Sequence, residues 1–158
     1  KSAEEILKEA CKTAKEQEKK VFLIFHASWC GWCHKMDKRM SLPEMKPYFD
    51  KNYVIEHIDV MEPAEKKNLE TPGGVELLNK YGGGKSGIPF WLIFDENGKL
   101  VADSQMRPAG TDLSVPGENI GCPQQPKEII AFKEVLKKTS SLTDAEIEQV
   151  GMVFSKEN

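Results

Sequence analysis

The sequence predicts an α/β fold, a three-layer α/β/α sandwich around a central mixed sheet. Segments with helical spacing alternate with short apolar runs that are typical of buried strands. Near the middle of the chain, two strand-like runs flank Asn97-Gly98, the strongest short signal for a hairpin. Alternating helices and strands followed by a hairpin indicate a sheet that contains both parallel and antiparallel pairs.

The N-terminal half begins with a predicted helix. Ser2 and Glu5 form the capping-box pattern, and apolar residues follow at helical spacing on one face. The next segments are expected to be a strand at 21–27, a helix from Cys30 to about Met40 that Pro43 ends, a helical piece at 44–51 and a strand at 54–60.

The C-terminal half is expected to complete the sheet and then to add two helices. A short helix at 75–81, a fully apolar strand at 90–94 and a return strand at 100–102 precede a long surface loop at 107–125, a helix from Pro126 and a helix at 142–155. Thr143 and Glu146 form a second capping box. We expect one domain over residues 1–158.

Composition and charge restrict the classes of partner. The chain has 158 residues and a formal net charge of −3, which argues against nucleic acid and anionic membranes as partners. No apolar run approaches the ~20 residues that span a bilayer, so we expect a soluble chain. We also expect a monomer. The chain begins at Lys1, which fits an exported mature protein or a trimmed chain equally well. A periplasmic or secreted location is expected, with the cytoplasm as the alternative.

The segment that indicates a redox function is Trp29-Cys30-Gly31-Trp32-Cys33-His34, which follows a predicted buried strand and begins a predicted helix. Cysteines three residues apart on a helical turn meet the Cα separation of ~4.4–6.8 Å that a disulfide needs. Cys30 faces the unpaired N–H groups of the helix N-terminus, which favour its thiolate, so we predict that it attacks a substrate disulfide. Cys33, one turn inward and more buried, is predicted to resolve the mixed disulfide.

These residues resemble the active site of the thioredoxin superfamily. The segment 27–33 is similar to the family's active-site sequence, and Ile88-Pro89 before an apolar strand is similar to its cis-proline element. The resemblance covers residues 20–138 and implies a thioredoxin fold that carries an additional N-terminal helix and an extra C-terminal helix. The helix break at Pro43 resembles the exported domains related to disulfide-relay reductases.

The resemblance also implies the roles of neighbouring residues. Pro89 is expected to be cis beside the cysteine pair, and the backbone of Ile88 is expected to pair with the substrate chain. The other contacts to substrate are expected from Trp29, Gly31 and Trp32.

The implied activity is thiol–disulfide exchange without a bound cofactor or metal. We expect reduction of disulfides in protein substrates, because Ile precedes the proline as in reducing thioredoxins, with electrons from an upstream dithiol donor. Three departures matter, of which one is that the 107–125 loop and the last helix have no counterpart in a minimal thioredoxin. The other two concern the site. Thioredoxins carry a buried carboxylate six residues before the first cysteine, where this chain has Ile24, so proton removal from Cys33 needs another group. Trp32 stands where the family usually has Pro, which affects the redox potential.

Other interpretations of the cysteines are weaker. Cys-x-x-Cys-His is also the attachment signature of c-type haem, but the flanking strands predict a compact sandwich without a haem-sized cavity. Zinc would need two further ligands, for which Cys11, Cys122 and the histidines are candidates that lack the spacing of a second Cys-x-x-Cys. A purely structural disulfide would add little stability in so small a ring. Cys122 lies in the predicted loop, where it could be exposed, and a Cys11–Cys122 bridge stays open.

The competing class of function is a binding or chaperone-like module. In that case the scaffold captures partners through its Trp-lined groove and the disulfide is incidental. His34, four residues after Cys30, is a candidate modulator of the thiolate pKa, although such a histidine is more often solvated surface.

Overall fold

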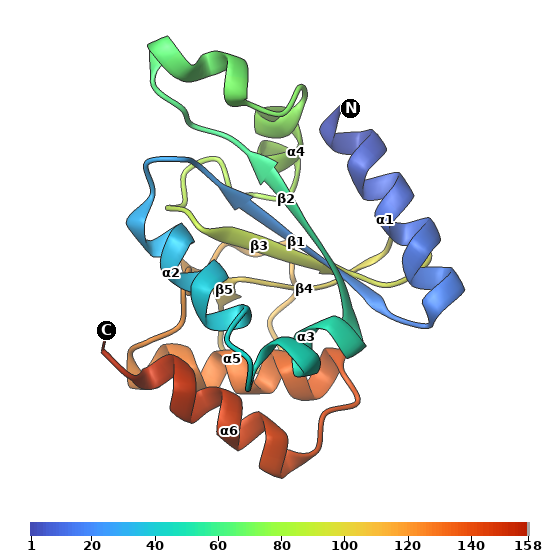
Figure 1. The fold of residues 1–158 in the computed structure, drawn as a ribbon, viewed down its shortest axis with the longest axis vertical. Helices are drawn as coiled ribbons and strands as arrows, with labels where there is room; N and C mark the ends of the chain where they lie inside the picture. Colours follow the sequence, from blue (N-terminus) through green and yellow to red (C-terminus); the bar gives the residue numbers. More distant parts are fainter. Residues whose placement is uncertain (158) are drawn as a thin grey trace.

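The structure, a computed structural model, describes residues 1–157 and contains a central sheet of four strands in the order β2–β1–β3–β4 (Figure 1). Strands β1 (Lys20–His26) and β2 (Tyr53–Asp59) run parallel. Strand β3 (Phe90–Phe94) is antiparallel to β1 and to β4 (Leu100–Asp103). The prediction of a mixed sheet is therefore confirmed.

Helices cover both faces of this sheet and complete the predicted three-layer sandwich. One face packs against α1 (Ala3–Gln17) and α4 (Gly74–Lys80), and the other against α2 (Gly31–Met40), α3 (Lys46–Asn52), α5 (Pro126–Thr139) and α6 (Asp144–Ser155). Figure 1 shows α5 and α6 side by side beneath the sheet. Within residues 1–157, no helix is both long and apolar enough to cross a membrane.

Three short elements connect these layers. They are a 3-10 helix η1 (Ala64–Leu69) between β2 and α4, and a small antiparallel sheet of β5 (Gln105–Met106) and β6 (Glu118–Asn119). The predicted helices and strands are all present, with ends that differ from the prediction by about two residues. Both predicted capping boxes, at Ser2 and at Thr143, form.

The core lies on both faces of β1 and β3, the two central strands. Every residue of β3 is buried, and so is β1 between its two terminal residues, which explains their unbroken apolar sequences. Phe22 and Trp91 meet at 5.2 Å between ring centroids, and Trp91 also packs against Phe132 of α5. Burying each such side chain contributes about 1.5–3 kcal/mol to folding. The residues that follow β1 are therefore held by a strand that is packed on both faces.

The segment at 107–125 is not the surface loop that the sequence predicts. Its first part is exposed, but Ile120 and Cys122 are buried in the core beside α2 and α5. The cause is Trp91, whose Nε1 donates a hydrogen bond to the carbonyl of Gly121 at 2.9 Å. Gly121 has a φ of +62°, a conformation that favours glycine at this turn. The Pro- and Gly-rich composition of this segment correctly indicates mostly irregular backbone, but it does not indicate that part of the segment is buried.

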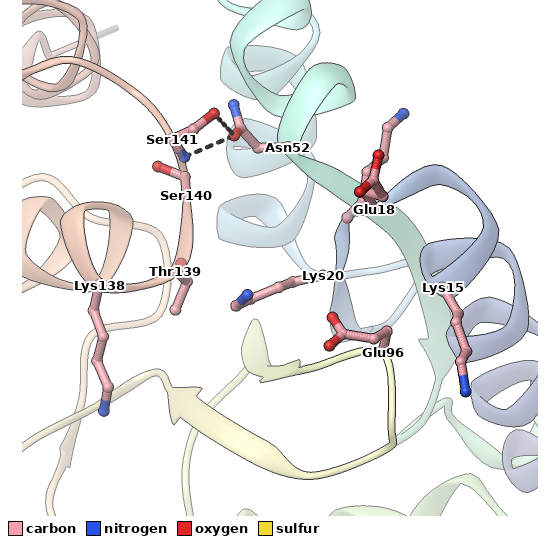
Figure 2. Close-up of a pocket in the computed structure, with 10 residues that line it drawn as sticks. Lys15, Glu18, Lys20, Asn52, Glu96, Lys138, Thr139, Ser140 and Ser141 are labelled. Carbon is pink, nitrogen blue, oxygen red and sulfur yellow. Dashed lines mark hydrogen bonds between the residues drawn. The ribbon is translucent and has the colours of Figure 1, made fainter.

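The pocket in Figure 2 lies at the end of β1 that is remote from the cysteine pair. Its volume is about 490 Å³, and its lining includes Lys20, the first residue of β1. Asn52 Oδ1 accepts hydrogen bonds from the backbone N–H and the hydroxyl of Ser141, at 2.9 and 3.0 Å. These contacts tie α3 to the segment that precedes α6. Because Cys30 follows the other end of β1, this pocket is not part of the cysteine site.

Candidate active site

The cysteine pair lies where β1 leads into α2. Cys30 and Cys33 form a disulfide with a Cα–Cα distance of 5.2 Å, as the sequence predicts. Helix α2 begins at Gly31, so Cys30 is its N-cap residue. Gly31 is exposed, and a side chain at its position would meet no atom within 4 Å.

The capping geometry favours negative charge on Cys30. Its sulfur accepts a hydrogen bond from the backbone N–H of Cys33 at 3.1 Å. A thiolate at this position would face the positive end of the helix dipole, which lowers the pKa of a cysteine. Exposure does not distinguish the two cysteines as strongly as predicted, since Cys30 is 3% exposed and Cys33 1%. The N-cap position is therefore the feature that separates their environments.

The Ile88–Pro89 segment lies directly against this pair. The peptide bond between the two residues is cis, and the carbonyl oxygen of Ile88 lies 3.6 Å from Cys30 Sγ. Ile88 also packs against the small apolar cluster of Ala27 and the two cysteines. On the other side, Asn119 Nδ2 donates hydrogen bonds to the carbonyls of Gly87 and Pro89, at 2.8 and 3.1 Å. The segment at 107–125 thus supports the proline segment.

A groove beside the cysteines offers a contact surface. Its volume is about 290 Å³, and its lining is formed by Trp32, Ile88, Pro89, Ile120, Gly121, Cys122, Gln124, Gln125 and Glu128. Trp29 and Trp32 are 58% and 49% exposed, which is unusual for such large apolar side chains. Trp29 Nε1 donates to the carbonyl of Met61 at 2.7 Å, and Lys35 Nζ lies 4.3 Å from the ring centroid of Trp32. Both rings are therefore held in place at the rim.

The segment before Cys30 is fixed by a carboxylate that the sequence analysis missed. Glu62 is almost fully buried and accepts hydrogen bonds from the Ser28 N–H at 2.8 Å and the Ser28 hydroxyl at 2.6 Å. These hydrogen bonds hold the pKa of Glu62 below its usual value. His34 Nε2 lies 2.7 Å from the Ser28 carbonyl oxygen, so its ring is engaged with the same segment. A direct influence of His34 on Cys30 stays a prediction.

The position of the missing thioredoxin carboxylate is occupied by Ile24, which is 1% exposed within the core. Another carboxyl group lies nearby, at the end of β2, where Asp59 pairs with His26 of β1. Burial, together with the adjacent Glu62 carboxylate, raises the pKa of Asp59 to about 6. Its Oδ1 atom has no hydrogen-bond partner within the described residues. Asp59 is thus a carboxyl group near the cysteine pair whose pKa lies much closer to neutrality than that of an ordinary aspartate.

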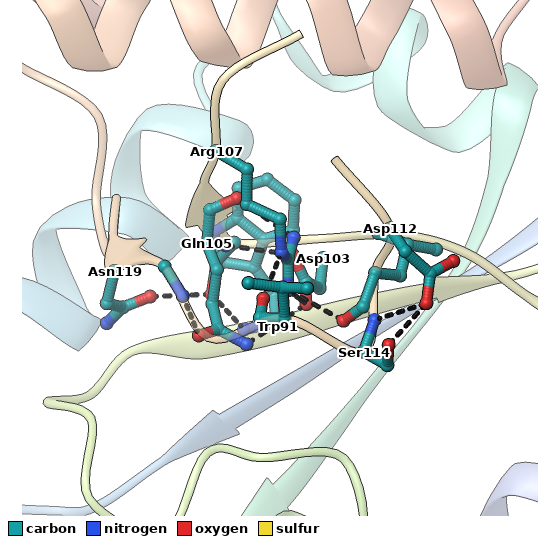
Figure 3. Close-up of polar contacts among 11 residues, drawn as sticks. Trp91, Asp103, Gln105, Arg107, Asp112, Ser114 and Asn119 are labelled. Atoms are coloured by element: carbon teal, nitrogen blue, oxygen red, sulfur yellow. Dashed lines mark hydrogen bonds and ion pairs between the residues drawn. The ribbon is translucent and has the colours of Figure 1, made fainter. Parts of the chain in front are cut away.

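A buried ion pair organises the start of the 107–125 segment (Figure 3). Arg107 donates two hydrogen bonds of 2.8 Å to the two carboxylate oxygens of Asp103. Gln105 Nε2 donates to the same carboxylate at 3.2 Å. Ser104 in turn donates from its hydroxyl to Asn119 Oδ1 at 2.6 Å. This network orients Asn119, which holds the proline segment next to Cys30.

Arg39 links α2 to α6. It lies in the last turn of α2 and is only 5% exposed. Its guanidinium donates hydrogen bonds to the carbonyls of Phe154 at 2.9 Å and Lys156 at 2.6 Å, and to Gln124 Oε1 at 3.0 Å. Two of these acceptors belong to the C-terminal end of α6, where helix carbonyls lack intrahelical partners.

The other two cysteines are free and lie on opposite faces of the sheet. Cys11 packs on the face covered by α1, whereas Cys122 belongs to the core beside α2, so they do not form a bridge. Cys122 is 5% exposed, so the exposure that its place in a predicted loop allowed is not found. Burial raises the pKa of Cys122 to about 11, against the opposing effect of the nearby Arg39 guanidinium.

We therefore expect Cys122 to resist alkylation in the folded protein. In reduced protein at pH 8, limiting iodoacetamide should label Cys30 first and leave Cys122 unmodified, since only thiolates react at a useful rate. Peptide mass spectrometry at successive times would measure this order. In urea the difference should vanish. Labelling of Cys122 as fast as Cys30 in the folded state would contradict its burial.

Comparison with sequence families gives a match over most of the chain. The model of a family described as "Thioredoxin-like domain" matches residues 7–109. No curated protein sequence matches this chain significantly.

Solved structures provide further similarities. A disulphide isomerase from Xylella fastidiosa Temecula1 is 26% identical over 65% of this chain and 73% of its own, with a TM-score of 0.54. The oxidised C-terminal domain of DsbD from Neisseria meningitidis is 25% identical over 85% of this chain and 96% of its own, with a TM-score of 0.50. A structure described as "DsbH Oxidoreductase" is 23% identical over 87% of this chain and 83% of its own, with a TM-score of 0.50, and supports the fold.

Proposed function

We propose that this chain, which belongs to the family of thioredoxin-like domains and is a thiol–disulfide oxidoreductase, reduces disulfides in other proteins. The observation that carries this proposal is the Cys30–Cys33 pair at the start of α2, with the sulfur of Cys30 capping the helix. The pair can alternate between a dithiol and a disulfide without bound cofactor, because the electrons move with the sulfur–sulfur bonds.

In the first step the Cys30 thiolate attacks one sulfur of a substrate disulfide. A bond forms between Cys30 Sγ and that sulfur, while the substrate's second sulfur leaves as a thiolate and takes up a proton. The helix N-terminus favours the thiolate form of Cys30 before attack. Ile88, whose carbonyl lies beside Cys30, is the backbone position that would align the substrate chain.

In the second step Cys33 loses its proton and attacks Cys30 Sγ. The Cys30–Cys33 disulfide forms again and the substrate's first sulfur leaves, so that two electrons and two protons have passed to the substrate. An upstream dithiol protein then returns two electrons to the pair. Because Ile24 stands at the position of the thioredoxin carboxylate, the proton of Cys33 leaves to water or to another group.

The surroundings of the pair favour a protein substrate. Trp29 and Trp32 present an exposed apolar rim, and the groove beside Ile88 is open. A chain segment could lie across these residues with its disulfide over Cys30. We propose that this activity takes place in the periplasm or outside the cell, because the disulfides of substrate proteins form and persist in such oxidising compartments.

A redox titration of the cysteine pair tests the proposal. Tryptophan fluorescence should follow the equilibrium in glutathione or dithiothreitol buffers, since Trp29 and Trp32 adjoin the disulfide. A potential near about −270 mV, with catalysed reduction of insulin, is the expected result for a reductase. A potential near about −120 mV would make the chain an oxidant instead.

The exposed tryptophan rim also fits a second function, a binding or chaperone-like module. A pair that does not titrate, together with peptide binding that survives replacement of both cysteines by serine, would favour that function and overturn the proposed enzyme.

A further inference from the structure

Two histidines and one aspartate meet on the face of the sheet that α2 covers. His26 ends β1, His57 lies in β2, and Asp37 lies on α2, one helical turn after Cys33. One potential ligand atom from each residue lies within 4.8 Å of the other two. Three separate elements of the fold therefore direct nitrogen and oxygen ligands to one point, although the sequence led us to expect no metal site.

The carboxylate of Asp37 lies close to both imidazole rings. His57 Nε2 is 2.8 Å from Asp37 Oδ1, and His26 Nδ1 is 4.0 Å from Asp37 Oδ2. The ring centroids of the two histidines are 4.6 Å apart, with an angle of 36° between the planes. An ion that replaced the proton shared by His57 and Asp37 would need only small side-chain movements to reach ligand distances of ~2.0–2.2 Å.

The ligand set is one that transition metals favour. Two imidazoles and one carboxylate with open remaining positions are found in catalytic zinc sites and in non-haem iron sites. The three side chains are between 26% and 35% exposed, so water can fill the remaining positions.

We propose that His26, Asp37 and His57 form a binding site for a divalent transition-metal ion such as Zn²⁺. The site uses none of the cysteines and is distinct from the disulfide exchange proposed above. A bound ion would join β1, β2 and α2 immediately behind the active-site turn. The simpler alternative is that the His57–Asp37 hydrogen bond only holds α2 against β2.

Histidine ring NMR on metal-free, oxidised protein separates these alternatives. The chain has three histidines, so the ¹H–¹⁵N ring signals can be assigned individually. On addition of Zn²⁺ we expect the signals of His26 and His57 to shift to saturation at one ion per chain. The signals of His34, whose Nε2 faces the Ser28 carbonyl, should stay in place. Unchanged signals of His26 and His57 would overturn the proposal.

Variants then test the ligand set by calorimetry with Zn²⁺. Asp37→Asn retains an acceptor for His57 but loses the charge, and we expect this variant and His57→Gln each to weaken binding at least about tenfold. His34→Gln is the matched control and should bind as the parent chain does. Equal affinities in all four proteins would overturn the proposal.

Cobalt provides a check on the donor atoms. Co²⁺ bound at this site should give weak d–d absorption without a thiolate-to-cobalt charge-transfer band. A charge-transfer band that disappears on replacement of Cys11 or Cys122 would assign binding to those thiols instead and overturn the proposal.

Discussion

Replacing Cys30 with serine is expected to reduce disulfide exchange to the rate of the uncatalysed reaction. The hydroxyl of serine does not ionise at neutral pH, so no nucleophile remains at the N-cap of α2, and Cys33 lies within the helix, away from the position that favours a thiolate. Replacing Cys33 with serine should give a different result. Cys30 would still attack, but no thiol could resolve the product, so a mixed disulfide with the substrate should accumulate.

Mass spectrometry of the intact protein and insulin reduction would measure these outcomes. Cys11→Ser is the matched control, because Cys11 is a free cysteine that packs on the opposite face of the sheet. It should retain the parent rate. Trapped substrate on Cys30→Ser rather than on Cys33→Ser would exchange the two assigned roles.

Replacing Arg39 with methionine is expected to destabilise the fold by about 2–4 kcal/mol. The variant approximately keeps the length of the side chain but removes the hydrogen-bond donors to the carbonyl oxygens of Phe154 and Lys156. The first of these bonds is buried. Each buried acceptor without a donor costs about 1–3 kcal/mol. For a chain of this size the corresponding decrease in Tm is about 5–15 °C.

Thermal and urea unfolding would measure this loss. Lys38→Met provides the control, since Lys38 is the neighbouring basic residue of α2 and is exposed. It removes the same charge and should change the stability by less than about 0.5 kcal/mol. Equal Tm values for the two variants would show that the buried hydrogen bonds of Arg39 contribute nothing to stability.

Much of the fold could be predicted because its signals are local. The apolar runs of β1 and β3, the capping box at Ser2 and the cysteine spacing each occupy a few consecutive residues. The same holds for the Cys30–Cys33 disulfide, whose two cysteines lie on one helical turn. Physical preferences of short segments are sufficient for features of this kind.

The rest depends on contacts between residues far apart in the chain. Glu62 and Ser28 are 34 positions apart, and nothing near either residue predicts their hydrogen bonds. His57 was an uninformative residue of an alternating strand until β2 placed it opposite α2, next to Asp37. The burial of Cys122 likewise depends on Trp91, which donates a hydrogen bond to the carbonyl of Gly121, the residue before Cys122. Sequence spacing carries no information about such long-range contacts.

The hydrogen bonds of Arg39 also have a consequence for the order of events during synthesis. Helix α2 leaves the ribosome before α6, and the carbonyls that accept hydrogen bonds from the Arg39 guanidinium belong to residues 154 and 156. At ~5–20 residues per second, those partners follow the cysteine pair by roughly 6–25 s. During that interval the C-terminal end of α2, the helix that begins at the cysteine pair, lacks the hydrogen bonds between Arg39 and these two carbonyls. The turn that carries the cysteine pair therefore reaches its final support only after α6 has been synthesised.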